Sequence, residues 1–190
     1  MYCDLMATLP NNPAYRAVEV REFLDMDFGD AKAELVDGMI WMMAGGSPKH
    51  AAVAANIIST LMVKLRGSGC RPYGSDLAMR TGKRSIRFPD VSVYCGNPAS
   101  PENDNKKLLG DPVVVFEVLS PSTASNDQIS KLAEYRALSG VQTIVFVDPD
   151  TERVRVIHQG EGGDWLPQGA SVLLPAIKAS LLSEEIFARD

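Results

Sequence analysis

The sequence has few cysteines, and their positions exclude several classes of protein. The three cysteines are Cys3, Cys70 and Cys95, and none belongs to a CxxC pair or to a Cys/His metal-binding spacing. An odd number argues against the disulfide framework that stabilises many small secreted domains. We therefore expect reduced thiols and a cytoplasmic protein.

Long apolar runs are also missing from the chain. No stretch approaches the roughly 18 to 20 residues that a membrane span requires. The first residues, MYCDLMATLPNNPAYR, lack the basic start and the continuous apolar segment of a signal peptide. We therefore expect no membrane partner.

The chain has no excess of positive charge. Its formal net charge is -5, so it repels a polyanion overall, and nucleic-acid binding would need a local basic patch. The candidates for that patch are Lys64, Arg66, Arg71, Arg80, Lys83, Arg84 and Arg87. The last four can equally form the solvated tip of a hairpin.

What is present is the composition of a globular protein with an ordinary core. The 190 residues are 45% hydrophobic, which is enough to bury a core in a single domain spanning residues 1–190. The patterns predict helices over residues 18–26, 48–66, 125–138 and 180–190, a hairpin at Asp37-Gly38, and strands over residues 76–80, 86–94, 113–119 and two more within 141–159. This order predicts an α/β (α+β) fold, with a mixed sheet and helices packed on it.

Two of the predicted strands carry a carboxylate where the core is expected. FPDVSVYCG contains Asp90, and VVVFEVLSPST contains Glu117. A buried carboxylate costs several kcal/mol unless a cation or hydrogen-bond donors compensate it. Alternatively, Asp90 bonds to nearby amides at a strand entrance and Glu117 pairs with an Arg. Two acids at adjacent strand ends also suit Mg²⁺, which would activate water for phosphodiester hydrolysis.

Three further residues are candidates for the same site. Lys131 lies four residues from both Asp127 and Tyr135 on a predicted helix, so it is either a cation beside the acids or half of a surface pair with Asp127. His50 stands in the first helical turn, where the helix dipole disfavours its charged form and leaves a neutral base or ligand. Alternatively, it is a solvated or capping side chain. Glu34 is either a third acid of the site or a strand-edge charge.

Five segments carry a resemblance to a known family. ELVDG, SPKH, RFPDVSVY, VVVFEVLSPST and DQISKLAEYRALSGVQTIVFVDP occur in this order. The chain thereby resembles, over about Val18 to Phe187, the Uma-two family of predicted endonucleases, a bacterial branch of the PD-(D/E)XK restriction-endonuclease-like superfamily. The resemblance implies a restriction-endonuclease-like mixed central sheet flanked by helices.

The resemblance also implies roles for the candidate residues. Asp90 and Glu117, with the carbonyl of Val118, would bind Mg²⁺ or Mn²⁺. Leu119 stands where the superfamily has its lysine, and Lys131 would replace that lysine from the following helix. Glu34 and His50 fall where the family carries Glu and His, and would tune or complete the site.

The expected function is therefore that of a metal-dependent nuclease acting on nucleic acid, with DNA as the expected substrate. A homodimer is expected, because two sites cut two strands more easily and symmetric dimers are common. Two alternatives stay open: a non-catalytic binding or scaffold protein that retains the acids, and a metal phosphohydrolase of small phosphoesters. A basic surround of the acids would favour the nuclease.

Overall fold

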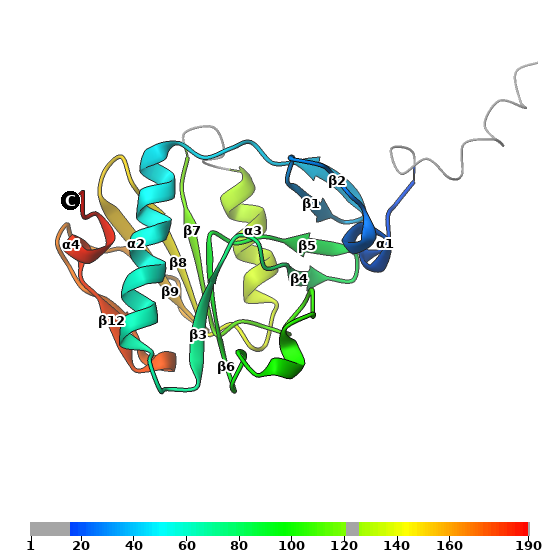
Figure 1. Cartoon of the computed structure of the whole chain (residues 1–190). Coiled ribbons are helices and arrows are strands. Elements are labelled where there is room, and N and C mark those ends of the chain that lie inside the picture. Colours follow the sequence, from blue (N-terminus) through cyan, green and yellow to red (C-terminus); the bar gives the residue numbers. More distant parts are fainter. Residues whose placement is uncertain (1–15, 121–125, 190) are drawn as a thin grey trace, which may run out of the picture. The chain divides into compact units, whose positions relative to one another are not determined.

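The computed structural model describes residues 16–120 and 126–189, and these form two compact units (Figure 1). Unit 1 comprises Met1–Gly45 and Arg80–Arg87, as far as these residues are described. Unit 2 comprises Gly46–Met79 and Phe88–Asp190 within the same limits. The single domain over residues 1–190 stays a prediction, and each unit is described by itself.

Unit 1 is built around a small antiparallel sheet. Its strand order is β2-β1-β5-β4. The elements are α1 (Val20–Asp25), β1 (Ala33–Val36), β2 (Met39–Met42), β4 (Met79–Gly82) and β5 (Ser85–Arg87), and the first residue of β4 is counted with unit 2. Asp37 and Gly38 both have positive φ, 50° and 84°, as a two-residue hairpin turn requires and as the Asp-Gly pair predicts.

Unit 2 contains a six-stranded mixed sheet in the order β10-β9-β8-β7-β6-β3. Its strands are β3 (Cys70–Gly74), β6 (Val91–Cys95), β7 (Val114–Val118), β8 (Thr143–Asp148), β9 (Arg153–His158) and β10 (Asp164–Trp165). Only β7 and β8 pair in parallel among the ladders described, and α3 (Asn126–Arg136) lies between them in the chain. The sheet is therefore mixed and flanked by helices, and the predicted fold class is confirmed.

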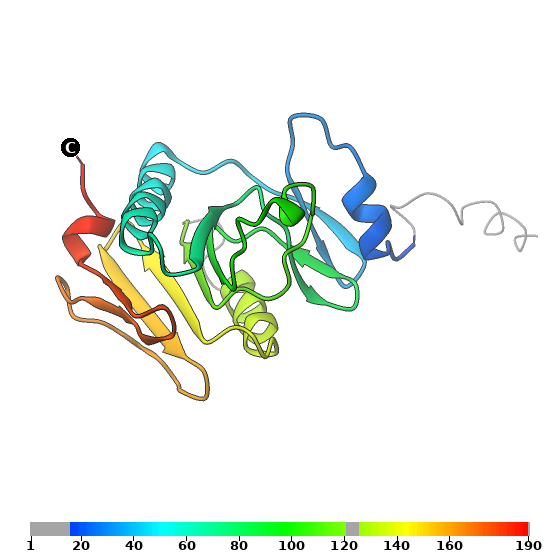
Figure 2. The same cartoon turned by 60° about the horizontal axis from the view of Figure 1, so that its bottom comes forward.

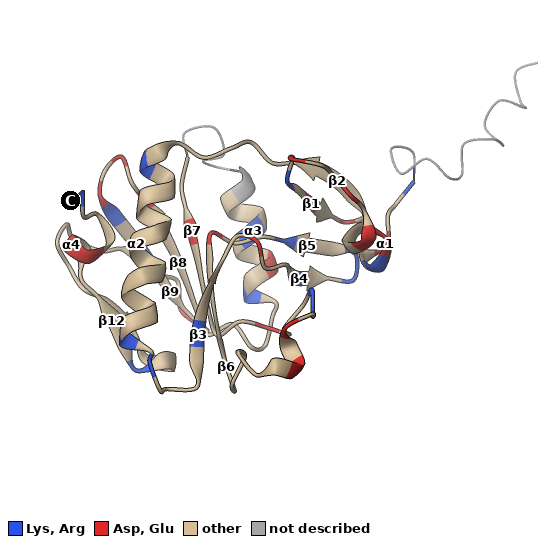
Figure 3. Cartoon of the chain, viewed as in Figure 1, with Lys and Arg blue, Asp and Glu red and all other residues tan. Residues whose placement is uncertain are grey.

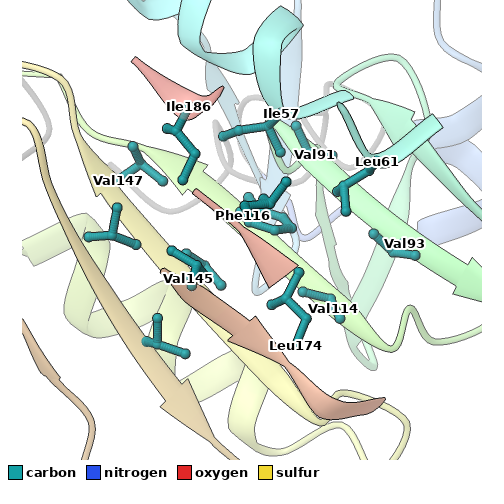
Figure 4. Packing of buried hydrophobic residues seen from close by; sticks show 14 of the residues in the cluster. Ile57, Leu61, Val91, Val93, Val114, Phe116, Val145, Val147, Leu174 and Ile186 are labelled. Atoms are coloured by element: carbon teal, nitrogen blue, oxygen red, sulfur yellow. The ribbon is translucent and has the colours of Figure 1, made fainter. Parts of the chain in front are cut away.

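The helix α2 (Pro48–Lys64) covers one face of this sheet. Ser47 caps it by accepting a hydrogen bond from the backbone N–H of His50, with Pro48 in the first turn. Val53, Ile57 and Leu61 on the helix pack with alternate residues of the central strands (Figure 4). The cap therefore fixes where His50 lies relative to the sheet.

The helix α3 covers the opposite face (Figures 1 and 2). Tyr135 of α3 packs with Val115 of β7 and with Ile144 and Phe146 of β8. Successive strand residues point to opposite faces, so β7 directs Val115 and Glu117 toward α3.

Several predicted boundaries are wrong for identifiable reasons. The strand expected over residues 86–94 is split into β5 and β6, because Pro89 cannot donate to a ladder. The C-terminal helix expected over residues 180–190 is only α4 (Ser183–Ile186), because residues 179–181 form β12 (Ala179–Leu181), which pairs with β11 (Val172–Leu174). The short helices η2 (Pro101–Asn103) and η3 (Pro175–Ile177) and strand β3 were not predicted, and Ser125 lies outside the described residues.

The cysteines differ from expectation as well. Cys70 of β3 and Cys95 of β6 are directly opposed cross-strand partners and form a disulfide. An odd number of cysteines does not prevent one pair from meeting, and pairing across a ladder is set by register, which cysteine counting ignores. The expectation of three reduced thiols is therefore wrong for this pair. Among the described residues no helix has the length and apolarity needed to cross a membrane.

Candidate active site

Glu117 is a buried acid on β7, an inner strand of the unit 2 sheet. β7 has the sequence Val-Val-Phe-Glu-Val and is buried along its whole length. In Figure 3 both β6 and β7 are tan over most of their length, because few of their residues are charged. Glu117 is 7% exposed and lies on the face that α3 covers. An ionised carboxylate at this place needs compensating donors.

The donors come from consecutive turns of α3. Lys131 Nζ lies 3.1 Å from Oε2 of Glu117, and the Tyr135 hydroxyl donates to Oε1 at 2.5 Å. Residues four apart share one helix face, so both side chains reach the same carboxylate. Lys131 is 8% exposed and Tyr135 is fully buried.

These contacts decide between the two alternatives for Lys131. Lys131 is not half of a solvated surface pair, because it is buried against Glu117; the side chain of Asp127 lies outside the described residues. The Glu117 carboxylate pairs with Lys131 and accepts a hydrogen bond from Tyr135. The predicted contact between Lys131 and Glu117 is thus present, while a catalytic role for Lys131 stays a prediction.

Asp90 lies in a bend between Pro89 and the first residue of β6. Its Oδ2 accepts a hydrogen bond from the backbone N–H of Val118 at 2.7 Å, which ties it to the end of β7. Its Oδ1 lies 3.4 Å from Nε2 of His50. The hydrogen bond to a backbone amide that was expected for an acid at a strand entrance is therefore present. His50 is a second partner of the same carboxylate.

His50 is more basic than its place in the helix predicts. Its pKa is raised above the ordinary value, chiefly by its contact with the Asp90 carboxylate. The Val118 carbonyl and the charge of Glu117 raise the pKa further, and together with Asp90 they outweigh the desolvation that lowers it. The Asp90 carboxylate thus acts on the imidazole in the opposite direction to the helix dipole, and the neutral form of His50 stays a prediction.

His50 also connects the two acids of the site. Both the Asp90 and the Glu117 charges act on its imidazole, and Val118 is bonded to Asp90 through its amide and to His50 through its carbonyl. Unit 2 therefore brings together four of the predicted site residues: His50, Asp90, Glu117 and Lys131. Tyr135 was not predicted as a site residue; its spacing of four from Lys131 was the signal that could have identified it.

Glu34 belongs to unit 1, where it is 6% exposed. Its Oε2 lies 2.8 Å from Nη1 of Arg87, whose side chain is 3% exposed. It is thus a buried ion-paired acid rather than a solvated strand-edge charge. Its place in the site stays a prediction, because each unit is described by itself.

Three of the seven candidates for a basic patch belong to unit 2, and they lie away from its acids. Lys64 is 14 residues from His50 along α2, about 21 Å at 1.5 Å per residue, and Arg66 lies beyond it. Arg71 faces Tyr94, four residues from Asp90, about 13 Å along the strand. Arg87 is occupied by Glu34. Lys64, Arg66 and Arg71 therefore do not surround these acids, and a basic face that includes the four residues of unit 1 stays a prediction.

The donor set of unit 2 fits a hard cation with few protein ligands. Within the described residues no group of three or more His, Cys, Asp or Glu side chains is arranged to hold a metal ion. Two carboxylates are nevertheless sufficient for Mg²⁺, which retains several waters and is often held by one or two acids plus substrate phosphate. A carboxylate oxygen can accept more than one partner, so the contacts with Val118 and Tyr135 do not exclude a metal.

Comparison with known proteins identifies the family of this chain. The Uma2 family model, described as "Putative restriction endonuclease", matches residues 20–186. Two proteins of Synechocystis sp. (strain ATCC 27184 / PCC 6803 / Kazusa) are similar. The protein slr1290 is 31% identical over 136 residues, or 71% of this chain and 70% of its own, and sll1609 is 28% identical over 138 residues, or 71% and 76%.

A solved structure shares the fold. The crystal structure described as a "putative nuclease belonging to DUF820" from Anabaena variabilis ATCC 29413 superposes with a TM-score of 0.74 at 22% identity, covering 90% of this chain and 98% of that one. The fold is therefore the restriction-endonuclease-like mixed sheet that the resemblance implied. Because the Uma2 model spans nearly the whole described chain, the protein belongs to the Uma2 family, a nuclease-like family of restriction-endonuclease type.

Proposed function

We propose that this protein is a Mg²⁺- or Mn²⁺-dependent nuclease that hydrolyses phosphodiester bonds in nucleic acid, with DNA as its substrate. The observation that carries the proposal is the buried Glu117 carboxylate with Lys131 Nζ 3.1 Å away, in the same unit as Asp90. A fold or a family name alone does not fix an activity, so the argument rests on these side chains.

Asp90 and Glu117, with the Val118 carbonyl, are the groups that would hold the ion. The Asp90 side chain is 17% exposed and that of Glu117 is 9% exposed, so Asp90 is the acid more open to a hydrated ion. When bound, a divalent ion lowers the pKa of a coordinated water and neutralises charge on a phosphoryl group.

The protein's own residues have separable tasks in this proposal. Lys131 brings a fixed positive charge to the acids, where it can orient the attacking water or stabilise charge that develops on the phosphate. Tyr135 holds one Glu117 oxygen and thereby fixes the carboxylate plane. His50 lies beside Asp90, whose carboxylate raises the pKa of the imidazole and so favours its protonated form. Glu34 completes or tunes the site as a further acid.

The homodimer also belongs to this proposal. A single site cuts one strand at a time, whereas two sites related by symmetry can cut both strands of a duplex. The net charge of -5 means that the protein lacks general attraction to DNA, so binding depends on the ion and on local contacts.

One observation favours the rival enzyme, a metal phosphohydrolase of small phosphoesters. Lys64, Arg66 and Arg71 of unit 2 lie far along their elements from the acids, as described above. A substrate without a long polyanionic chain needs no extended basic face. The substrate experiment therefore includes a small phosphodiester.

The test compares substrates and metals on one preparation. Purified protein is incubated with single-stranded, duplex and branched DNA, with RNA, and with bis(p-nitrophenyl) phosphate, each with Mg²⁺, Mn²⁺ or EDTA, beside Glu117→Ala. The proposal expects cleavage of DNA with metal, none with EDTA, and none by the variant. Turnover of the small phosphodiester alone would favour the rival enzyme, and no turnover of any substrate would favour the scaffold protein.

A further inference from the structure

β2 forms an edge of the unit 1 sheet without the features that usually protect an edge. It pairs with β1 on one side, and no described strand pairs with its other side. Its sequence, Met-Ile-Trp-Met, contains neither a charged residue nor a proline. Native edge strands are commonly blocked by such residues, so β2 is open to pairing with another strand.

The side chains of β2 are as unusual as its backbone. Met39 is 61% exposed, Trp41 57% and Met42 60%. Met39 and Trp41 point to one face of the sheet and Met42 to the other, because strand residues alternate. A partner that covers this strand must therefore be apolar on both of its faces, as another apolar strand is.

The direction of the backbone groups can be read from the hairpin. The backbone N–H of Met43 donates to the carbonyl of Lys32 at 2.8 Å, and Trp41 is paired with Glu34 in the same ladder. In an antiparallel ladder alternate residues bond to the neighbour, so Met39, Trp41 and Met43 bond toward β1. Ile40 and Met42 consequently direct their N–H and C=O groups to the open edge.

We propose that β2 pairs antiparallel with β2 of a second copy of this chain, about a two-fold axis through Trp41. In this register Ile40 lies opposite Met42 of the second copy, so the outward backbone groups of both copies meet as hydrogen-bonded pairs. The two four-stranded sheets then form one continuous eight-stranded sheet. This contact gives the homodimer of the proposed function an interface, and it does not depend on catalysis.

Charge and area both favour a second copy as the occupant. β2 carries no charge, so two identical strands meet without repulsion, and a nucleic acid finds no cation on the strand itself. At the exposures given above, the three side chains leave roughly 350 Å² per copy uncovered, since a large side chain has about 150–250 Å² to bury. Two copies would bury roughly 700 Å² from these side chains alone, more than half of the ~1,200 Å² of a small specific interface.

The experiment measures the dimerisation of the full chain by sedimentation equilibrium. Met42→Pro removes an N–H at the open edge and leaves the ladder with β1 intact, whereas Met42→Lys places a charge in the contact. Leu173→Lys is the matched control, because Leu173 on β11 is also 60% exposed. We expect the wild type to be a dimer and the control to have the same dissociation constant. In both Met42 variants the dimer dissociation constant should rise at least about thirty-fold, which is the effect of losing a hot-spot residue.

A cross-link tests the register even if a variant folds poorly. Trp41 on the axis forms a non-hydrogen-bonded pair with Cα atoms about 4.5 Å apart, which is within the range of a disulfide. Trp41→Cys should therefore give a covalent dimer on mild oxidation, and Leu173→Cys should not. A monomeric wild type at all concentrations, or a dimer that the Met42 variants leave unchanged, overturns the proposal. DNA nicking by the same Met42 samples reports the nuclease activity separately.

Discussion

Lys131 Nζ lies 3.1 Å from Oε2 of Glu117, although the two residues are 14 positions apart and belong to a helix and a strand. Both side chains are almost fully buried. Removing one member of a buried ion pair leaves an uncompensated charge. The contribution of this ion pair to the free energy of unfolding can therefore be measured without an activity assay.

Lys131→Met should lower the free energy of unfolding by about 3 kcal/mol, as measured by urea denaturation in EDTA. Adding Glu117→Gln to Lys131→Met should recover part of this loss, because it removes the unpaired charge. Lys49→Met is the control: the Lys49 to Asp150 pair is exposed, with side chains 40% and 61% accessible, and should contribute less than about 1 kcal/mol. Equal costs at Lys49 and Lys131 would contradict the buried pair.

Tyr135→Phe should lower both stability and cleavage. The variant keeps the buried ring but removes the hydroxyl that donates to Glu117 Oε1, and a hydrogen bond to a charged group is worth about 1.5–3 kcal/mol. Tyr94→Phe is a matched control, since Tyr94 is 2% exposed and its hydroxyl has no hydrogen-bond partner in the described part of the chain. We expect Tyr94→Phe to leave the free energy of unfolding unchanged or to raise it. A larger loss of unfolding free energy in Tyr94→Phe than in Tyr135→Phe would contradict the assigned role of Tyr135.

The His50 titration gives a pH prediction with a definite sign. Its pKa is raised in the folded protein, first of all by Asp90, so its contribution to stability is fully present below the unfolded value near ~6.5 and is lost as the pH rises through the higher folded pKa. The imidazole titration followed by NMR in EDTA should give a pKa above the unfolded value, and Asp90→Asn should lower it. No change in Asp90→Asn would show that the carboxylate is not the cause.

The Cys70–Cys95 disulfide should stabilise unit 2 by closing a loop with a sequence separation of 25. In the chain-entropy model such a loop is worth about 3.5 kcal/mol. Dithiothreitol, or the pair Cys70→Ser and Cys95→Ser, should therefore lower the unfolding free energy by about this amount, whereas Cys3→Ser should not. Reaction of all three cysteines with a thiol reagent in the untreated native protein would contradict the disulfide.

Much of the site was predictable because its signals are local. An acid within an apolar strand, as at Glu117, indicates a compensating partner, whereas the placement of Lys131 beside it was implied by the family resemblance. The Asp37-Gly38 turn and the Ser47-Pro48 helix start were predictable for the same reason, since each depends on the conformational preference of adjacent residues.

The parts that could not be predicted depend on pairing between distant segments. The basicity of His50 comes from Asp90, 40 positions later in the sequence, and the ion pair of Arg87 comes from Glu34 through the β1–β5 ladder. The cysteine pair likewise depends on the register of β3 against β6. Residue types and local spacing do not specify such registers.

The central claim is that Glu117 and Asp90 support metal-dependent cleavage of DNA. Its most direct measurement is the initial rate of duplex DNA cleavage in saturating Mn²⁺ by the wild type, Glu117→Gln, Asp90→Asn and the control Glu152→Gln, which changes an exposed acid paired with Arg189. We expect the Glu152 variant to cleave at the wild-type rate, and both site variants to lose at least about a hundredfold, the scale of a lost transition-state contact. Wild-type rates in folded Glu117→Gln and Asp90→Asn, or equal rates with Mn²⁺ and with EDTA, would contradict the account.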